Sequence, residues 1–241
     1  MRKQMFTGAL VCCVLALATV PLWAQGGPRQ GMCLLATETA QALEPAEARE
    51  LAYIREQEKL AMDFNAAMQA RWGLRVFDNI SRSEKRHFAA MKLLLDRHNL
   101  PAPVQEMPAG TFSDPGLQTM YGDLMNQGEQ SLESALRAAA SIEDFTIHNL
   151  DKAIAATDKS DLKMIYGNLR NGSTNHIRAL VRQLQRTGQS YSPQYVSPAV
   201  FSEIMNDALS PRGRGLGAGY GSGRGGGGGR GGAWGNSRFR P

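Results

Sequence analysis

Residues 83–87 read Ser-Glu-Lys-Arg-His, and this stretch lies inside an apolar run with helical spacing. A carboxylate and an imidazole there occupy positions where the periodicity places core residues. A buried carboxylate is costly unless a proton, a cation or a metal ion accompanies it, so the rest of the chain is expected to supply such a partner. Steps of three and four residues through the run define one helix face, which carries Phe77, Ile80, Glu84, His87, Met91 and Leu94.

Stripes of the same kind recur along the chain and predict an all-α fold. We expect helices over 45–72, 76–99 and 161–186, and one long helix that begins at 113–115 and continues past Leu150, with a break near Thr146 as an open alternative. The connections are short, long and short, the long one spanning residues 100–114. This order predicts an antiparallel four-helix bundle with one long crossover connection.

The two ends of the chain differ from this body. A basic start and an apolar run that ends at Ala24 predict a signal peptide and therefore export to the periplasm or the medium. A membrane anchor is the alternative, although the run is short for a membrane span. The predicted organisation is a signal peptide (1–24), a linker (25–43), the bundle (44–188), an extension with a short helix (189–210) and a disordered tail (211–241).

The formal net charge of +5 is a property of the ends. Residues 212–241 hold six Arg, 14 Gly and no acid, a composition that cannot build a core. Without that tail and the two basic residues of the leader, 19 basic residues face 22 acidic ones, a net charge of −3. An exported protein rarely meets nucleic acid, so we favour association of the tail with the cell envelope over nucleic-acid binding.

Buried polar residues are predicted at matching heights in both helix pairs. Residues equally far from the turn between two antiparallel helices lie at the same height. The midpoint of Glu58 and Glu84 is residue 71, beside the turn signal Trp72-Gly73-Leu74. The midpoint of Glu143 and His176 falls between residues 159 and 160, at the turn signal 158–160.

These residues resemble the ligand set of a carboxylate-bridged metal pair. In such bundles, two helices each give one Glu and the other two each give Glu-x-x-His. Here one helix offers Glu84-x-x-His87, whereas its counterpart offers Ser173-x-x-His176. Carboxylates with imidazole suit iron or manganese, and zinc as well, so we expect one or two ions. The predicted metal ligands are Glu58, Glu84, His87, Glu143 and His176.

Residues 44–200 resemble the ferritin-like domain of the family called domain of unknown function 2202. The motifs that carry the resemblance are Arg55-Glu56-Gln57-Glu58-Lys59-Leu60-Ala61, Trp72-Gly73-Leu74, Phe77-Asp78-Asn79-Ile80 through His87, Gln130-Ser131-Leu132-Glu133, Gly172-Ser173-Thr174-Asn175-His176 and Pro193-Gln194-Tyr195. More distantly, the chain is similar to rubrerythrin. The resemblance implies a di-iron fold with the five residues above in ligand positions, and it implies no reaction. The chain departs from rubrerythrin-like proteins at Ser173 and Thr146, where they have acids, and at Asn65, which is often Tyr.

Two functions of different classes follow. The first is an exported metal-binding protein with oxygen or peroxide chemistry. It would need an external electron donor, because the sequence has no rubredoxin-type cysteine pairs. The second is a metal-free helical interaction module with a relict site and a basic tail. A homo-oligomer fits either function, and His98 and His148 fall off the stripes and are expected to be solvated.

Overall fold

The structure, a computed structural model, describes residues 40–101 and 107–207. The elements of this part of the chain are all helices, with no strand, which confirms the prediction of an all-α fold. The predicted signal peptide, most of the linker, the end of the extension and the Gly/Arg tail lie outside the described residues. The helices are α2 (Pro45–Trp72), α3 (Arg75–Arg97), α4 (Pro115–Gly128), α5 (Leu132–Ala156), α6 (Ser160–Arg186) and α7 (Pro198–Asp207).

The first two helices begin and end close to where the sequence signals place them. Pro45 starts α2, where its missing N–H is not needed, and Glu47 accepts a hydrogen bond from the Glu44 N–H. Gly73 ends α2 in the left-handed conformation, at φ 66°, which glycine adopts without steric cost. The chain therefore turns back at once, and α3 begins at Arg75.

The predicted third helix is two helices. The chain leaves α4 at Gly128, and Ser131 starts α5 by accepting a hydrogen bond from the Ser134 N–H. Residues 126–131 contain no large apolar side chain and the apolar stripe of α5 begins at Leu132, so the periodicity of that stripe says nothing about the junction. The alternative break near Thr146 is absent, because α5 runs on without interruption to Ala156.

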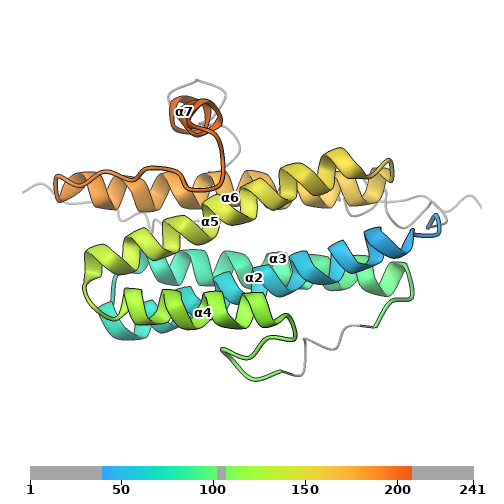
Figure 1. The fold of residues 1–241 in the computed structure, drawn as a ribbon, viewed down its shortest axis with the longest axis horizontal. Helices are drawn as coiled ribbons and strands as arrows, with labels where there is room; N and C mark the ends of the chain where they lie inside the picture. Colours follow the sequence, from blue (N-terminus) through green and yellow to red (C-terminus); the bar gives the residue numbers. More distant parts are fainter. Residues whose placement is uncertain (1–39, 102–106, 208–241) are drawn as a thin grey trace, which may run out of the picture. The chain divides into compact units, whose positions relative to one another are not determined.

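The four long helices form two hairpins (Figure 1). Helix α2 packs along α3, and α5 packs along α6. The hairpins meet where α2 contacts α5 and α3 contacts α6, while α4 lies against α2 and α5. Residues from different hairpins are thereby brought to the same height.

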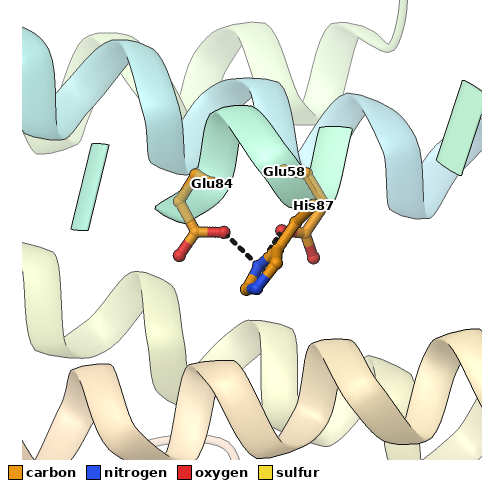
Figure 2. Close-up of side chains that lie close together, drawn as sticks. All are labelled: Glu58, Glu84 and His87. Atoms are coloured by element: carbon orange, nitrogen blue, oxygen red, sulfur yellow. Dashed lines mark hydrogen bonds and ion pairs between the residues drawn. The ribbon is translucent and has the colours of Figure 1, made fainter. Parts of the chain in front are cut away.

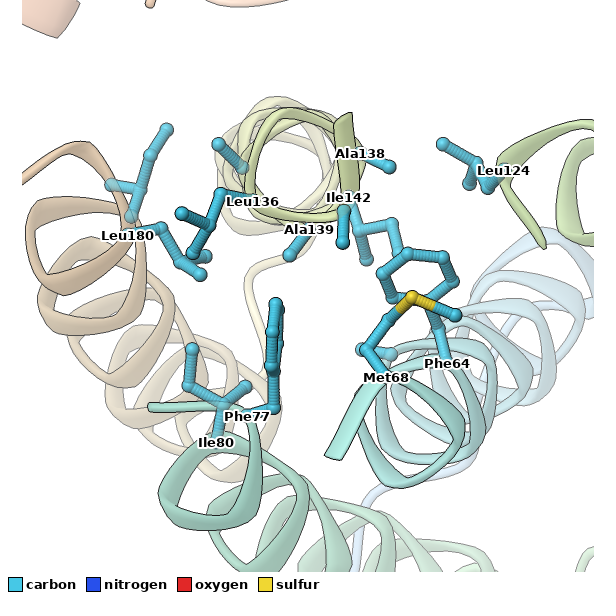
Figure 3. Close-up of a cluster of buried hydrophobic side chains, with 14 of the residues drawn as sticks. Phe64, Met68, Phe77, Ile80, Leu124, Leu136, Ala138, Ala139, Ile142 and Leu180 are labelled. Atoms are coloured by element: carbon cyan, nitrogen blue, oxygen red, sulfur yellow. The ribbon is translucent and has the colours of Figure 1, made fainter. Parts of the chain in front are cut away.

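Apolar side chains fill the space between the hairpins (Figure 3). Small residues of α5 bring its backbone close to its neighbours, whereas aromatic and aliphatic side chains fill the rest. Each large apolar side chain buried here contributes roughly 1.5–3 kcal/mol relative to leaving it in water. The labelled members are Phe64, Met68, Phe77, Ile80, Leu124, Leu136, Ala138, Ala139, Ile142 and Leu180.

Buried polar residues of α2 hold the long connection before α4. The carboxylate of Glu56 accepts from the Ser113 and Asp114 N–H groups, and Asp63 accepts from the Gly110 N–H at 2.9 Å. Lys59 donates to Asp63 and to the Pro108 carbonyl. Glu56 and Asp63 are therefore structural anchors.

One expected surface histidine is buried. The His98 side chain is only 2% exposed, and its Nε2 lies 3.0 Å from Asp161 Oδ2. This contact joins the C-terminal end of α3 to the start of α6, and the sequence stripes could not show it because it arises between hairpins. None of the described helices is both long and apolar enough to cross a membrane.

Candidate metal centre

The structure gathers the side chains of all five predicted metal ligands in the interior. Glu58 comes from α2, Glu84 and His87 from α3, Glu143 from α5 and His176 from α6. The three acids are each 1% exposed. The five residues form two groups of three that share Glu84, and within each group the ligand atoms all lie within 4.8 Å of one another.

The first triad, Glu58, Glu84 and His87, lies within the α2–α3 hairpin (Figure 2). His87 Nδ1 is 2.7 Å from Glu84 Oε2 and 3.2 Å from Glu58 Oε2. Three-residue spacing puts Glu84 and His87 on one face of α3, so one segment offers both an oxygen and a nitrogen atom. This triad is one candidate ion site.

The second triad, Glu84, Glu143 and His176, joins the two hairpins. His176 Nδ1 is 2.6 Å from Glu84 Oε1 and 3.5 Å from Glu143 Oε1. All three of these atoms lack a hydrogen-bond partner among the described residues, so the close contacts are ion-pair distances without hydrogen-bond alignment. Atoms that converge without bonding one another are arranged as ligands of a common cation would be.

The two imidazole rings stack on each other. Their centroids are 5.7 Å apart, with 26° between the ring planes. Glu84 directs one carboxylate oxygen to each ring. The Glu84 carboxylate therefore lies between the two imidazole rings, and each ring also contacts a second Glu that the other ring does not.

Burial and mutual repulsion push the three acids apart in their pKa values. Burial and the Glu84 charge raise the pKa of Glu58 to about 8, and the same two causes raise the pKa of Glu143. Burial also acts to raise the pKa of Glu84, but the charges of His176 and His87 hold it well below its usual value. Glu84 is thus the carboxylate that stays ionised.

The pKa values of both histidines are raised by the neighbouring acids. Burial opposes the charged ring, but Glu84 and then Glu143 raise the pKa of His176 to about 10. Burial likewise opposes protonation of His87, and the Glu84 charge raises its pKa well above the usual value. Without metal, protons therefore take the place of a cation in the cluster.

Three neutral polar groups on the helices that carry the cluster are also unpartnered. Thr146 Oγ1, Ser173 Oγ and Asn65 Oδ1 have no hydrogen-bond partner among the described residues, and their residues are at most 2% exposed. Thr146 lies one turn from Glu143, and Ser173 lies one turn from His176. The side chains at these positions are neutral, so they add no charge to the site.

Sequence reasoning missed the role of Asp144, which follows Glu143 directly. Its Oδ2 accepts from the Tyr191 hydroxyl at 3.0 Å and from two backbone N–H groups, and its Oδ1 accepts from the Val196 N–H at 2.8 Å. Asp144 fixes the extension after α6 to the side of α5. The Pro193-Gln194-Tyr195 motif was the available signal for this contact.

The chain belongs to a family whose description is "Uncharacterized protein domain (DUF2202)", whose model matches residues 47–208. A similar protein is Uncharacterized protein MJ0754 of Methanocaldococcus jannaschii, which is 40% identical over 168 residues, 70% of this chain and 91% of that protein. The crystal structure of hypothetical protein MJ0754 superposes with a TM-score of 0.69 at 40% identity, covering 70% of this chain and 97% of that one. Both descriptions leave the function open.

Proposed function

We propose that the protein binds two divalent transition-metal ions within a ferritin-like four-helix bundle distantly similar to rubrerythrin. Iron is the first candidate for these ions. The observation that carries the proposal is the sharing of Glu84 between two buried triads, each with its own Glu and its own His. Oxygen and nitrogen donors in this combination suit iron and manganese, and zinc as well.

The charge of the cluster fits such a pair of ions. Three buried carboxylates with no lysine or arginine among their described ion pairs need a partner for their charge, which in the metal-free form is supplied by protons on the histidines and on the acids themselves. Two divalent ions bring +4 against −3 and free both rings to offer Nδ1. The unpartnered oxygen atoms of Glu58, Glu84 and Glu143 would then have a partner.

Bound iron would supply oxygen or peroxide chemistry, with electrons from an external donor. The chain's own contribution is to hold three carboxylates and two imidazoles in fixed places and to keep bulk water out. We also propose that the protein is exported, on the strength of the leader sequence of residues 1–24. N-terminal sequencing of protein from its native host tests export, and a retained Met1 would contradict it.

The competing function is a metal-free interaction module in which Glu–His contacts satisfy one another. The two hydrogen bonds of His87 favour it, because they pair that ring with Glu84 and Glu58 without any ion. The contacts of His176 disfavour it, since they lack hydrogen-bond geometry.

Metal analysis and thermal unfolding separate the two functions. Protein purified without chelator should contain metal, and ferrous or manganous ion should stabilise the metal-free form by about 2.7 kcal/mol at a hundredfold excess over the dissociation constant. Glu84→Ala should abolish this stabilisation, because both triads lose their shared acid. Asp96→Ala is the matched control, an exposed acid of the same helix that pairs with Lys92. Equal melting temperatures with and without metal in the unmutated protein would favour the interaction module.

A further inference from the structure

We propose that Gly172 is a positioning residue for the candidate metal centre: the missing side chain at this position leaves the space that the His87 ring occupies. The inference rests on the proposed function for its effect on metal. It concerns a residue that offers no ligand atom and lies on a different hairpin from the ring it positions.

The contact between α6 and the His87 ring is very close. A Cβ atom built on Gly172 would lie 2.7 Å from His87 Nε2 and closer still to Cε1. Cβ atoms essentially never approach a side chain to under 3.0 Å, so either the ring or the helix must move to accept one. Glycine is unfavourable in the middle of a helix, and here the close approach of another side chain explains its presence.

The part of the His87 ring that is closest to Gly172 is not the atom that contacts the acids. Cε1 and Nε2 of His87 are the ring atoms nearest to a Cβ at position 172, whereas Nδ1, which contacts Glu84 and Glu58, would lie 3.7 Å from it. A methyl group at position 172 would push the ring away from α6. Nδ1 would then leave its place between the two carboxylates.

The same helix supplies a matched control. Gly167 also lies inside α6, and a Cβ atom there would meet nothing within 4 Å. Gly167→Ala and Gly172→Ala thus make the same chemical change with the same gain in helix propensity. They differ only in what the new methyl group meets.

The first test measures manganous and ferrous ion by equilibrium dialysis followed by metal analysis. The unmutated protein and Gly167→Ala should hold two ions, whereas Gly172→Ala should hold one and bind the other at least tenfold more weakly. The ion that weakens should be that of Glu58, Glu84 and His87, so His87→Ala should lose the same one. Two ions bound by Gly172→Ala with unchanged affinity would overturn the inference.

The second test needs no metal and separates the inference from the proposed function. Gly172→Ala should lower the melting temperature of metal-free protein, and it should leave it unchanged or raise it when His87 is already Ala. Such dependence on the partner is the signature of direct coupling between two residues. Equal changes in both backgrounds would overturn the inference. A lack of metal in the unmutated protein would overturn only the proposed function.

Discussion

Glu143 and Asp144 are neighbours on α5 and both are buried, but their carboxylates have different kinds of partner. Asp144 accepts four hydrogen bonds, three of them from backbone N–H groups of the extension after α6. Glu143 faces Glu84 and His176, and its Oε1 has no hydrogen-bond partner among the described residues. Burial alone therefore does not distinguish a structural carboxylate from a candidate ligand, whereas the partner of each oxygen atom does.

The same distinction sorts the acids of α2. Glu56 and Asp63 accept from backbone N–H groups of the long connection and resemble Asp144. Glu58 lies between them in the sequence, points toward another acid and resembles Glu143. The chain thus alternates acids that hold loops with acids that face a common centre.

The largest expected effect comes from removing the structural acid. Asp144→Ala leaves four donors without their acceptor, so we expect the free energy of unfolding to fall by about 3–5 kcal/mol, with or without metal. Glu143→Gln should change metal-free stability by less than about 1 kcal/mol, because burial already favours the neutral form of this side chain. Urea unfolding of both variants measures the difference. Similar losses of stability in the two variants would contradict the distinction between a structural acid and a candidate ligand.

A smaller effect is expected from pH on metal-free protein. His176, with a pKa raised from 6.5 to about 10, and Glu58, raised from 4.5 to about 8, keep protons in the folded state that the unfolded chain has lost. Stability should therefore fall as pH rises from 6.5 to 8, by on the order of 3 kcal/mol. The contribution of Glu84, whose pKa is lowered, is complete in this window and disappears only in acid, below about pH 4.5.

Thermal unfolding of metal-free protein at several pH values checks this expectation. Metal-loaded protein is the control, because ligands that hold an ion have already given up their protons. The loaded form should show a flatter pH dependence between about 6.5 and 8. Stability of the metal-free form that rises across this window would contradict the assignment of protons to the cluster.

The smallest effect is expected at Arg55, a buried charge that neither holds a loop nor belongs to the metal cluster. Its guanidinium lies 3.9 Å from the centroid of the Phe88 ring, and its three nitrogen atoms have no hydrogen-bond partner among the described residues. Arg55→Met keeps most of the buried volume and removes the charge, so it should change the free energy of unfolding by less than about 1 kcal/mol or stabilise the protein. Urea unfolding measures the change, and a loss above about 2 kcal/mol would show that the cation is paired after all.

Helix periodicity predicted most of the fold and the meeting of the five side chains. Both depend on local features: stripes at three- and four-residue spacing, Gly73 at one turn and the polar signal 158–160 at the other. Equal distance from a turn sets the height of a residue within its hairpin. The amino-acid sequence alone therefore suffices to pair the candidate ligands within each hairpin.

Contacts between hairpins were not predictable in this way. The burial of His98 against Asp161 and the approach of Gly172 to His87 depend on how α3 lies beside α6. The junction between α4 and α5 had local signals in Gly128 and Ser131, which stand in a polar stretch that the apolar stripe of α5 does not reach. The role of Asp144 was missed because most of its partners are backbone N–H groups, and the Pro193-Gln194-Tyr195 motif, which supplies two of them, was the indirect signal for it.

One triad lies within a single hairpin and the other joins the two hairpins, and this difference affects the folding kinetics. Glu58, Glu84 and His87 belong to one hairpin, so their contacts can form early and locally. The contact of Glu84 with His176 exists only once the hairpins have docked. An ion held there would stabilise the docked state without stabilising the barrier before it, so it would slow unfolding and leave the folding rate unchanged. Metal supply would then govern how long a folded molecule persists, and the chain alone would govern how fast one forms.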